Sequence, residues 1–163
     1  MKMRESLTRV YNELSSDEEL LRLLYYKPEN ALDDPLSIEK SNVLDKSEDE
    51  KWDIIEDVIA KSKKIQDLDS DKKMRILMYL SRRSPERGNY WVSSQYLVVD
   101  VVAHKDFDEM DFRLSWICDK VNEILFNNHV AGTGKLKFID GDDLKTPDDY
   151  VGYRLVYAYS NTN

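Results

Sequence analysis

The chain has 163 residues, of which 41% are apolar and 34% charged, with 32 acidic against 24 basic side chains. This size and apolar content predict one domain, or one domain with an extended helical arm, under a heavily charged surface. The formal net charge of −8 argues against general affinity for nucleic-acid backbones, which needs clustered Lys and Arg. A negative wall would instead repel phosphate, so the charge is compatible with lining a path through which DNA slides.

Cys118 is the single cysteine of the chain, which excludes an intramolecular disulfide and a multi-cysteine zinc site. The first eleven residues are polar and lack the apolar core of a signal peptide. No stretch approaches the roughly 18 apolar residues of a membrane-spanning helix. We therefore expect a soluble protein, cytosolic where it is made and without a membrane partner.

Residues 1–70 are predicted to form a helical segment with a long loop. Two short helices should open it, the second capped by Ser16 and carrying leucines from Leu20 to Leu24. The first has apolar residues at helical spacing, namely Leu7, Val10, Tyr11 and Leu14. Turn-forming residues from Lys27 to Glu48 predict a long loop, either an interaction loop or a covered surface connection.

A third helix is predicted from about Glu48 to Ser62, because its apolar residues share one helical face. Those residues are Trp52, Ile55, Val58 and Ile59.

Residues 71–163 are predicted to form an α+β core. Two strands, Met74–Leu80 and Tyr96–Ala103, should flank a mobile basic loop over Ser81–Ser94. The strongest helical pattern runs from Asp108 to Asn127, with Asp106 or Asp108 as its cap. Its buried stripe is predicted to be Leu114, Ile117, Val121, Ile124 and Leu125.

Two further strands, Leu136–Ile139 and Tyr150–Tyr159, should enclose an acidic loop over Asp140–Asp149. In the last strand one face is predicted to carry Val151, Tyr153, Leu155, Tyr157 and Tyr159. The resulting β-β-α-β-β order predicts a mostly antiparallel sheet with a long helix packed on one face and an N-terminal helical extension.

The segment Gly132-Thr133-Gly134-Lys135 suggests a phosphate-binding loop but departs from that motif. His129 stands where the first glycine is required, and Leu136 stands where a magnesium-binding hydroxyl is required. A helix-to-strand turn explains these glycines, so we predict no nucleotide cofactor.

Metal and nucleophile chemistry are equally weakly supported. Asp100 and His104 share one face of a strand, but the acids that follow lack the order and the glycine of an EF-hand and suit a helix start. Cys118 lies inside the main helix, where an inert buried thiol is the default, and His129 belongs to no nucleophile motif. The sequence therefore predicts no metal site, no catalytic residue and no cofactor.

One local basic cluster, followed by two aromatic residues, interrupts this acidic chain. It consists of Arg82, Arg83, Arg87, Tyr90 and Trp91. Arg, Tyr and Trp are favoured at protein interfaces, whereas the simpler interpretation is a solvated loop. The acidic loop offers the complementary charge through Asp140, Asp142, Asp143, Asp148 and Asp149. We predict that these two segments form a contact between neighbouring subunits.

The order of elements resembles the tail-terminator and tail-to-head joining proteins of long-tailed bacteriophages. The resemblance covers roughly residues 72–160 and is carried by five segments: Arg75–Leu80, Leu97–His104, Val121–Leu125, Gly134–Phe138 and Gly152–Tyr157. The N-terminal 70 residues are larger than a minimal member of that group needs.

The resemblance implies a structural virion protein and not an enzyme. Proteins of that group form rings, commonly of six copies, that end the tail tube or join it to the head connector. Expected partners are therefore other copies of this chain, the tail tube protein and the connector or stopper protein, with DNA passing through without specific binding. A small cytosolic adaptor or an enzyme with an unrecognised acidic site is the alternative.

Overall fold

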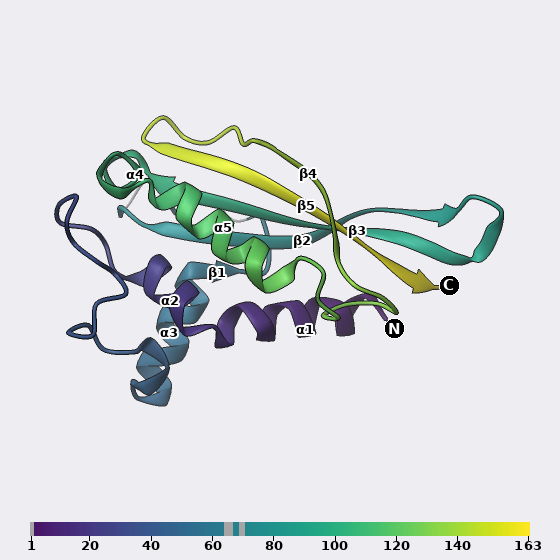
Figure 1. Ribbon diagram of the computed structural model, residues 1–163, viewed down its shortest axis with the longest axis horizontal. Helices are drawn as coiled ribbons and strands as arrows, with labels where there is room; N and C mark the ends of the chain where they lie inside the picture. Colours follow the sequence, from purple (N-terminus) through teal and green to yellow (C-terminus); the bar gives the residue numbers. More distant parts are fainter. Residues whose placement is uncertain (1, 64–66, 69–70) are drawn as a thin grey trace.

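The computed structural model describes residues 2–63, 67–68 and 71–163. Figure 1 shows α1, α2 and α3 gathered below the sheet, with α5 crossing in front of its strands. The bounds of the first three helices are α1 Met3–Ser16, α2 Glu18–Tyr25 and α3 Glu48–Val58. The two opening helices are confirmed, but the cap of α2 is Asp17 and not Ser16, because the Asp17 carboxylate accepts the Leu20 amide.

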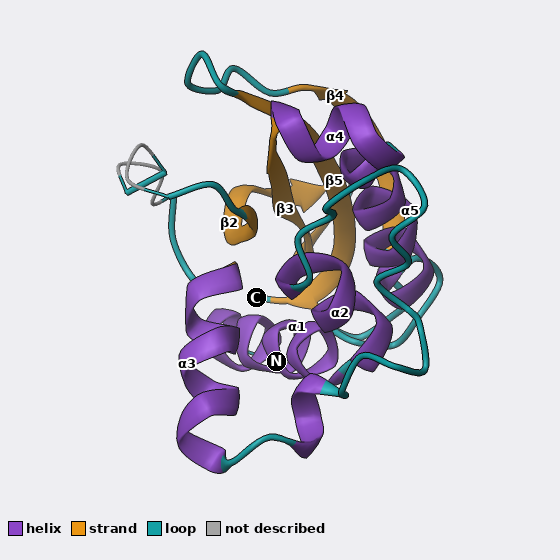
Figure 2. Ribbon diagram, turned by 90° about the vertical axis from the view of Figure 1, so that its left-hand side faces the viewer, coloured by secondary structure: helices purple, strands orange, loops and turns teal. Residues whose placement is uncertain are grey.

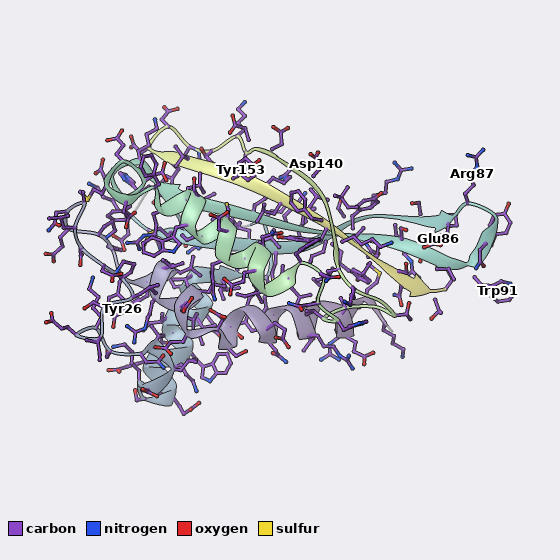
Figure 3. The ribbon with its side chains drawn as sticks, in the orientation of Figure 1. Tyr26, Glu86, Arg87, Trp91, Asp140 and Tyr153 are labelled. Carbon is purple, nitrogen blue, oxygen red and sulfur yellow. The ribbon has the colours of Figure 1, made fainter. Side chains whose placement is uncertain are left out.

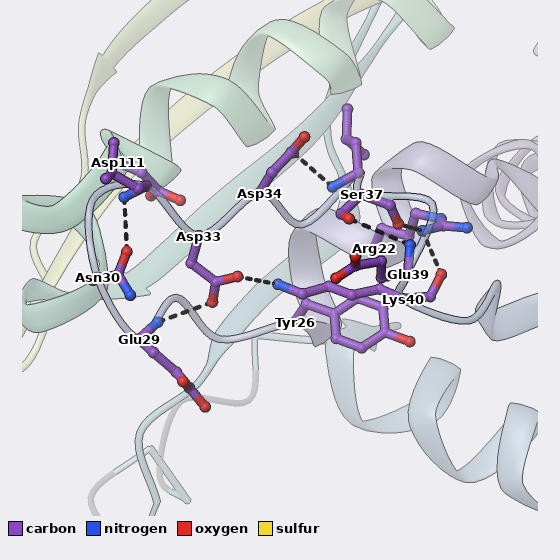
Figure 4. Close-up of polar contacts among 12 residues, drawn as sticks. Arg22, Tyr26, Glu29, Asn30, Asp33, Asp34, Ser37, Glu39, Lys40 and Asp111 are labelled. Atoms are coloured by element: carbon purple, nitrogen blue, oxygen red, sulfur yellow. Dashed lines mark hydrogen bonds and ion pairs between the residues drawn. The ribbon is translucent and has the colours of Figure 1, made fainter.

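The loop between α2 and α3 is irregular as predicted, apart from the short 3-10 helix η1 (Val43–Asp45). Arg22 of α2 holds it by donating from Nη1 to the carbonyls of Ser37 and Lys40, at 3.1 and 2.9 Å. Asp33 accepts from the Glu29 amide and from Lys40 Nζ, which closes the loop on itself (Figure 4). The loop therefore has a defined shape set by its own polar side chains.

Helix α3 ends earlier than predicted. It begins at Glu48 as expected, but at Ile59 the chain becomes the short strand β1 (Ile59–Ala60). Strand β1 pairs in parallel with Ile76 and Leu77 of β2. The apolar residues Val58 and Ile59 fit a helical face equally well, so only this pairing decides where the helix stops.

The sheet is mixed and has the strand order β1-β2-β3-β5-β4. Its long strands are β2 Met74–Glu86, β3 Asn89–His104, β4 Lys137–Asp143 and β5 Tyr150–Thr162. All pairs except β1–β2 are antiparallel, which confirms the predicted α+β class and mostly antiparallel sheet. Figure 2 shows α5 lying along these strands.

One face of the sheet carries the main core against the helices. Alternate residues of β2, β3 and β5 point into it, as predicted for β5, where Leu155, Tyr157 and Tyr159 are buried there. The opposite face carries a smaller cluster of Leu68, Leu77, Val102 and Tyr150. Because side chains alternate along a strand, Asp100 and Arg154 also fall on this second face.

The predicted single helix over Asp108–Asn127 is two helices, α4 (Lys105–Asp111) and α5 (Arg113–Leu125). Phe112 separates them in the left-handed conformation, with φ 54°. Asp108 does cap a helix, but its carboxylate accepts the Leu114 amide of α5 at 2.9 Å. The predicted stripe is confirmed, with Ile117, Val121 and Leu125 fully buried.

Candidate assembly surface

The segment Ser81–Ser94, predicted as a mobile basic loop, is instead the far half of a β-hairpin. Strand β2 continues to Glu86 and β3 begins at Asn89, so only Arg87 and Gly88 lie between them. Gly88 has φ 81°, a conformation that suits glycine. The hairpin extends away from the rest of the molecule, with Arg87 and Trp91 at its tip (Figures 1 and 3).

A bulge at Ser81 and Arg82 separates the core part of the hairpin from this arm. The register moves from Leu80↔Leu97 to Arg83↔Gln95 across it. Gln95 is fully buried, and its side-chain Nε2 donates to the carbonyls of Ser81 and Arg82 at 3.1 and 3.3 Å. The polar residues of this stretch predicted a loop. In the structure Gln95 provides hydrogen-bond donors for the backbone carbonyls of a β-bulge.

The C-terminal end of β5 braces the arm. Strand β5 stays paired with β3 as far as Thr162↔Val92. Arg83 donates to Ser93 Oγ at 2.8 Å and to Asn163 Oδ1 at 2.7 Å, and the Asn163 amide donates to the Trp91 carbonyl at 2.8 Å. Arg83 is therefore a structural residue of the arm, unlike the other two arginines of the predicted cluster.

The remaining residues of the basic cluster face solvent. Arg82 and Arg87 are exposed, and the side chains of Tyr90 and Trp91 are 81% and 80% exposed. Two aromatic side chains so exposed at the end of an arm are unusual for a surface that contacts only water. The arm thus presents cations and aromatic rings together.

The acidic segment is a strand for its first half. Asp140, Asp142 and Asp143, predicted in a loop, belong to β4, whereas Asp148 and Asp149 lie in the connection that follows. The strand was under-predicted because Asp and Gly disfavour strands. Among the described residues it forms an edge of the sheet and pairs with β5 alone. All five carboxylates are exposed.

Two of these aspartates hold backbone amides of their own strand. Asp140 Oδ1 accepts from the Gly141 amide at 2.9 Å, and Asp142 Oδ1 accepts from the Asp143 amide at 2.8 Å. These amides are two residues apart and so lie on the same side of the strand. The carboxylates thereby block part of an edge that could otherwise pair with another chain.

The two charged segments do not meet within one chain. Asp140 lies over the middle of the molecule, whereas Arg87 and Trp91 lie at its far end (Figure 3). Cations and aromatic side chains are therefore presented at one place and carboxylates at another. Contact between them requires two molecules.

Sequence reasoning missed a polar network on the second face of the sheet. Arg154 Nε and Nη2 donate to the two oxygens of Asp100 at 2.7 and 2.9 Å, and the Tyr79 hydroxyl donates to Asp100 Oδ2 at 2.8 Å. Burial, followed by the hydrogen bond to Asp100, raises the pKa of Tyr79 to about 12. The single sequence signal was an aspartate inside an apolar strand.

Of the residues considered for catalysis, His104 has a structural role and Cys118 is a poorly reactive thiol. His104 caps α4, since its Nδ1 accepts the Asp106 amide at 3.2 Å. Burial raises the pKa of the Cys118 thiol to about 12, with Asp119 and Asp108 adding to the effect. Over the described parts of the chain, no three His, Cys, Asp or Glu residues group closely enough to hold a metal ion.

The glycine-rich segment is a turn bound to β5. The Thr133 amide donates to the Ser160 carbonyl at 2.9 Å, and Gly132 has φ 67°. Lys135 is exposed beyond this turn. Within residues 2–63, 67–68 and 71–163, no helix is long and apolar enough to cross a membrane.

These features define an α+β protein with a mixed sheet, a braced hairpin arm and an acidic strand at one edge. A family model described as YomW matches residues 17–159. The SPbeta prophage-derived protein YomW of Bacillus subtilis (strain 168) is 31% identical over 167 residues, with 95% of each chain covered. The chain therefore belongs to the YomW family, a phage-derived family.

Proposed function

We propose that this chain is a structural virion protein that forms a ring at the head–tail junction of a tailed phage. The ring ends the tail tube or joins it to the head connector, and it leaves a passage for DNA. This proposal agrees with the prophage origin of the relative and with the resemblance to tail-terminator and joining proteins.

The observation that carries the proposal is the separation of two complementary surfaces on one chain. The arm presents Arg82, Arg87, Tyr90 and Trp91, while the β4 edge presents aspartates. A contact between different surfaces of identical subunits is heterologous, and such contacts close into rings when their rotation closes. The net charge of −8 would keep DNA phosphates from adhering to the wall of the passage.

The proposal is tested by the mass of the protein in solution, alone and mixed with the tail tube and connector proteins of its phage. We expect a ring-sized particle in at least one of these samples. The variant Arg87→Glu with Tyr90→Ser and Trp91→Ser should lose that particle yet unfold at the parent temperature, because these side chains are exposed.

A matched control replaces exposed residues away from the arm, with Glu13→Lys and Trp52→Ser. This control should assemble like the parent. A parent protein that stays monomeric with every one of these partners, or an arm variant that assembles normally, would argue against the proposal.

A further inference from the structure

Strand β2 is only partly covered on the side that faces away from β3. Strand β1 pairs with Ile76 and Leu77, so it covers the first part of β2 on that side. Across the described residues, no strand pairs with the rest of that side, from Met78 to Glu86. Unpaired strand edges readily accept a strand from another chain.

A groove lies where β1 stops. It has a volume of about 520 Å³ between α1 and the β2 edge, and it is lined by Arg4, Leu7, Thr8, Tyr11, Lys61 and Met78. Tyr11 is 8% exposed, and its hydroxyl has no hydrogen-bond partner among the described residues. Lys61 lies over the Tyr11 ring at 4.3 Å. The groove thus offers an apolar floor, a cationic rim and an unused hydroxyl.

Strand β4 has the matching features at the opposite edge of the sheet. It is seven residues long, and it ends in the acidic run described above. Its Phe138 and Ile139 side chains are 43% and 48% exposed. The acidic end of such an edge strand fits a cationic groove beside another edge strand.

Strand polarity agrees with this match. The order β2-β3-β5-β4, with antiparallel pairing at each step, makes β4 antiparallel to β2 within one copy. In a ring whose strands run along its axis, every copy has the same polarity, so β4 of one copy meets β2 of the next in antiparallel fashion. Such contacts join the sheets into a closed wall without free edges.

The order of charges is also complementary in that direction. Along the β2 edge the charges are Lys61 beside Met78, then Arg82 and Arg83, then Glu86. Along β4, read backwards, they are Asp143, Asp142, Asp140 and Lys137. In this direction the cationic part of the β2 edge lies beside the acidic part of β4 and Glu86 lies towards Lys137, whereas the reversed direction would place like charges together at both ends.

We infer that β4 of one copy adds as an antiparallel strand to the free edge of β2 in the next copy, with its acidic end at the groove between α1 and Met78. This inference rests on the proposed ring and names the contact that closes it. The arginine and lysine side chains of the receiving copy draw the carboxylates of Asp140 and Asp142 away, which frees the Gly141 and Asp143 amides for the new ladder.

Charge exchange tests the contact. One variant carries Lys61→Glu with Arg82→Glu, and the other carries Asp140→Lys with Asp143→Lys. Each alone should lose the ring seen for the parent, because every contact then pairs like charges. An equimolar mixture should regain it as an alternating ring, and so should the chain that carries all four changes. Glu13→Lys with Lys135→Glu is the control and should assemble like the parent.

Amide hydrogen exchange gives a readout that needs no variant. Assembly of the parent should slow exchange in residues 78–86 and 137–143 together, because both edges gain a strand. A ring in which neither edge gains protection, or charge variants that assemble alone, would overturn the inference and leave the proposed function standing. A parent chain that never assembles, with or without its phage partners, would overturn both.

Discussion

Asp100 of β3 and Arg154 of β5 form a two-pronged ion pair across neighbouring strands, with Nε–Oδ1 and Nη2–Oδ2 distances of 2.7 and 2.9 Å. The Asp100 side chain is 7% exposed, whereas that of Arg154 is 40% exposed. The Tyr79 hydroxyl completes the group by donating to Asp100 and accepting from Arg154 Nη2 at 2.9 Å. This network ties together β2, β3 and β5 on the face that the helices leave uncovered.

The network should make stability depend on alkaline pH. The pKa of Tyr79 rises from 10.0 to about 12 on folding, chiefly because of burial. Between these values the unfolded chain loses the proton while the folded chain keeps it, so stability is full below pH 10 and falls as pH rises towards 12. Urea unfolding from pH 9 to 12 should show a shallower fall for Tyr79→Phe than for the parent.

Tyr90→Phe is the control for that experiment, because its exposed hydroxyl lies outside the network. It should keep the parent slope. Equal slopes for Tyr79→Phe and the parent would contradict the assignment.

Arg113 should be among the residues most important for stability. It is fully buried, and its Nη1 donates to the carbonyls of Leu23 and Tyr26 at 2.8 and 2.5 Å, while Nη2 pairs with Asp111 at 2.7 Å. Arg113→Met leaves a buried carboxylate and two carbonyls unpaired, which should cost about 3–5 kcal/mol of unfolding free energy. Denaturant unfolding measures this cost. Arg9→Ala, at an exposed ion pair, should change it by less than about 0.5 kcal/mol.

Gly132 should tolerate substitution less well than the neighbouring Gly134. A Cβ atom at Gly132 would overlap the Ser160 carbonyl oxygen, and φ there is 67°, whereas a Cβ atom at Gly134 meets nothing within 4 Å. We expect Gly132→Ala to lower the unfolding free energy by about 3 kcal/mol or more, because overlap adds to backbone strain. Gly134→Ala should change it by less than about 1 kcal/mol. Similar melting temperatures for both variants would refute this.

Phe112 carries backbone strain that a glycine should relieve. It is 76% exposed and has φ 54°, a conformation that bulky residues rarely adopt. Relief of about 1–2 kcal/mol of strain, less about 0.5–1 kcal/mol for the greater freedom of glycine when unfolded, predicts that Phe112→Gly stabilises by about 0.5–1 kcal/mol. Phe126→Gly, at φ −64°, should give no gain. Thermal unfolding of both variants decides this, and a loss of stability in Phe112→Gly would show that the ring itself contributes to packing.

Local patterns predicted most of the fold correctly. The stripe Ile117, Val121 and Leu125 and the alternating β5 residues are strong periodic signals, and both lie in the core as expected. The hairpin arm was missed because Ser, Arg, Pro and Gly over residues 81–94 are typical of loops. Its strands exist because β5 pairs with β3 as far as Val92 and Gln95 satisfies the bulge.

The candidate surface was predicted in composition but not in shape. Arg82, Arg87, Tyr90 and Trp91 are exposed together, yet Arg83 serves the arm itself. The groove beside Met78 had no local signal, because it combines side chains of α1 with the residues around the end of β1. The periodicity of apolar residues describes one helix or strand at a time, so it cannot predict a groove formed by two elements that are distant in the sequence.

The sequence by itself determined the α+β class, the core positions and the opposite charges of two segments, because each depends on residues close together in the chain. The tertiary structure alone decided the strand order, the extended arm, the break at Phe112 and the free edges of β2 and β4. Those features depend on pairings such as Asp100 with Arg154, which lie 54 residues apart and acquire their energy only when the sheet has formed.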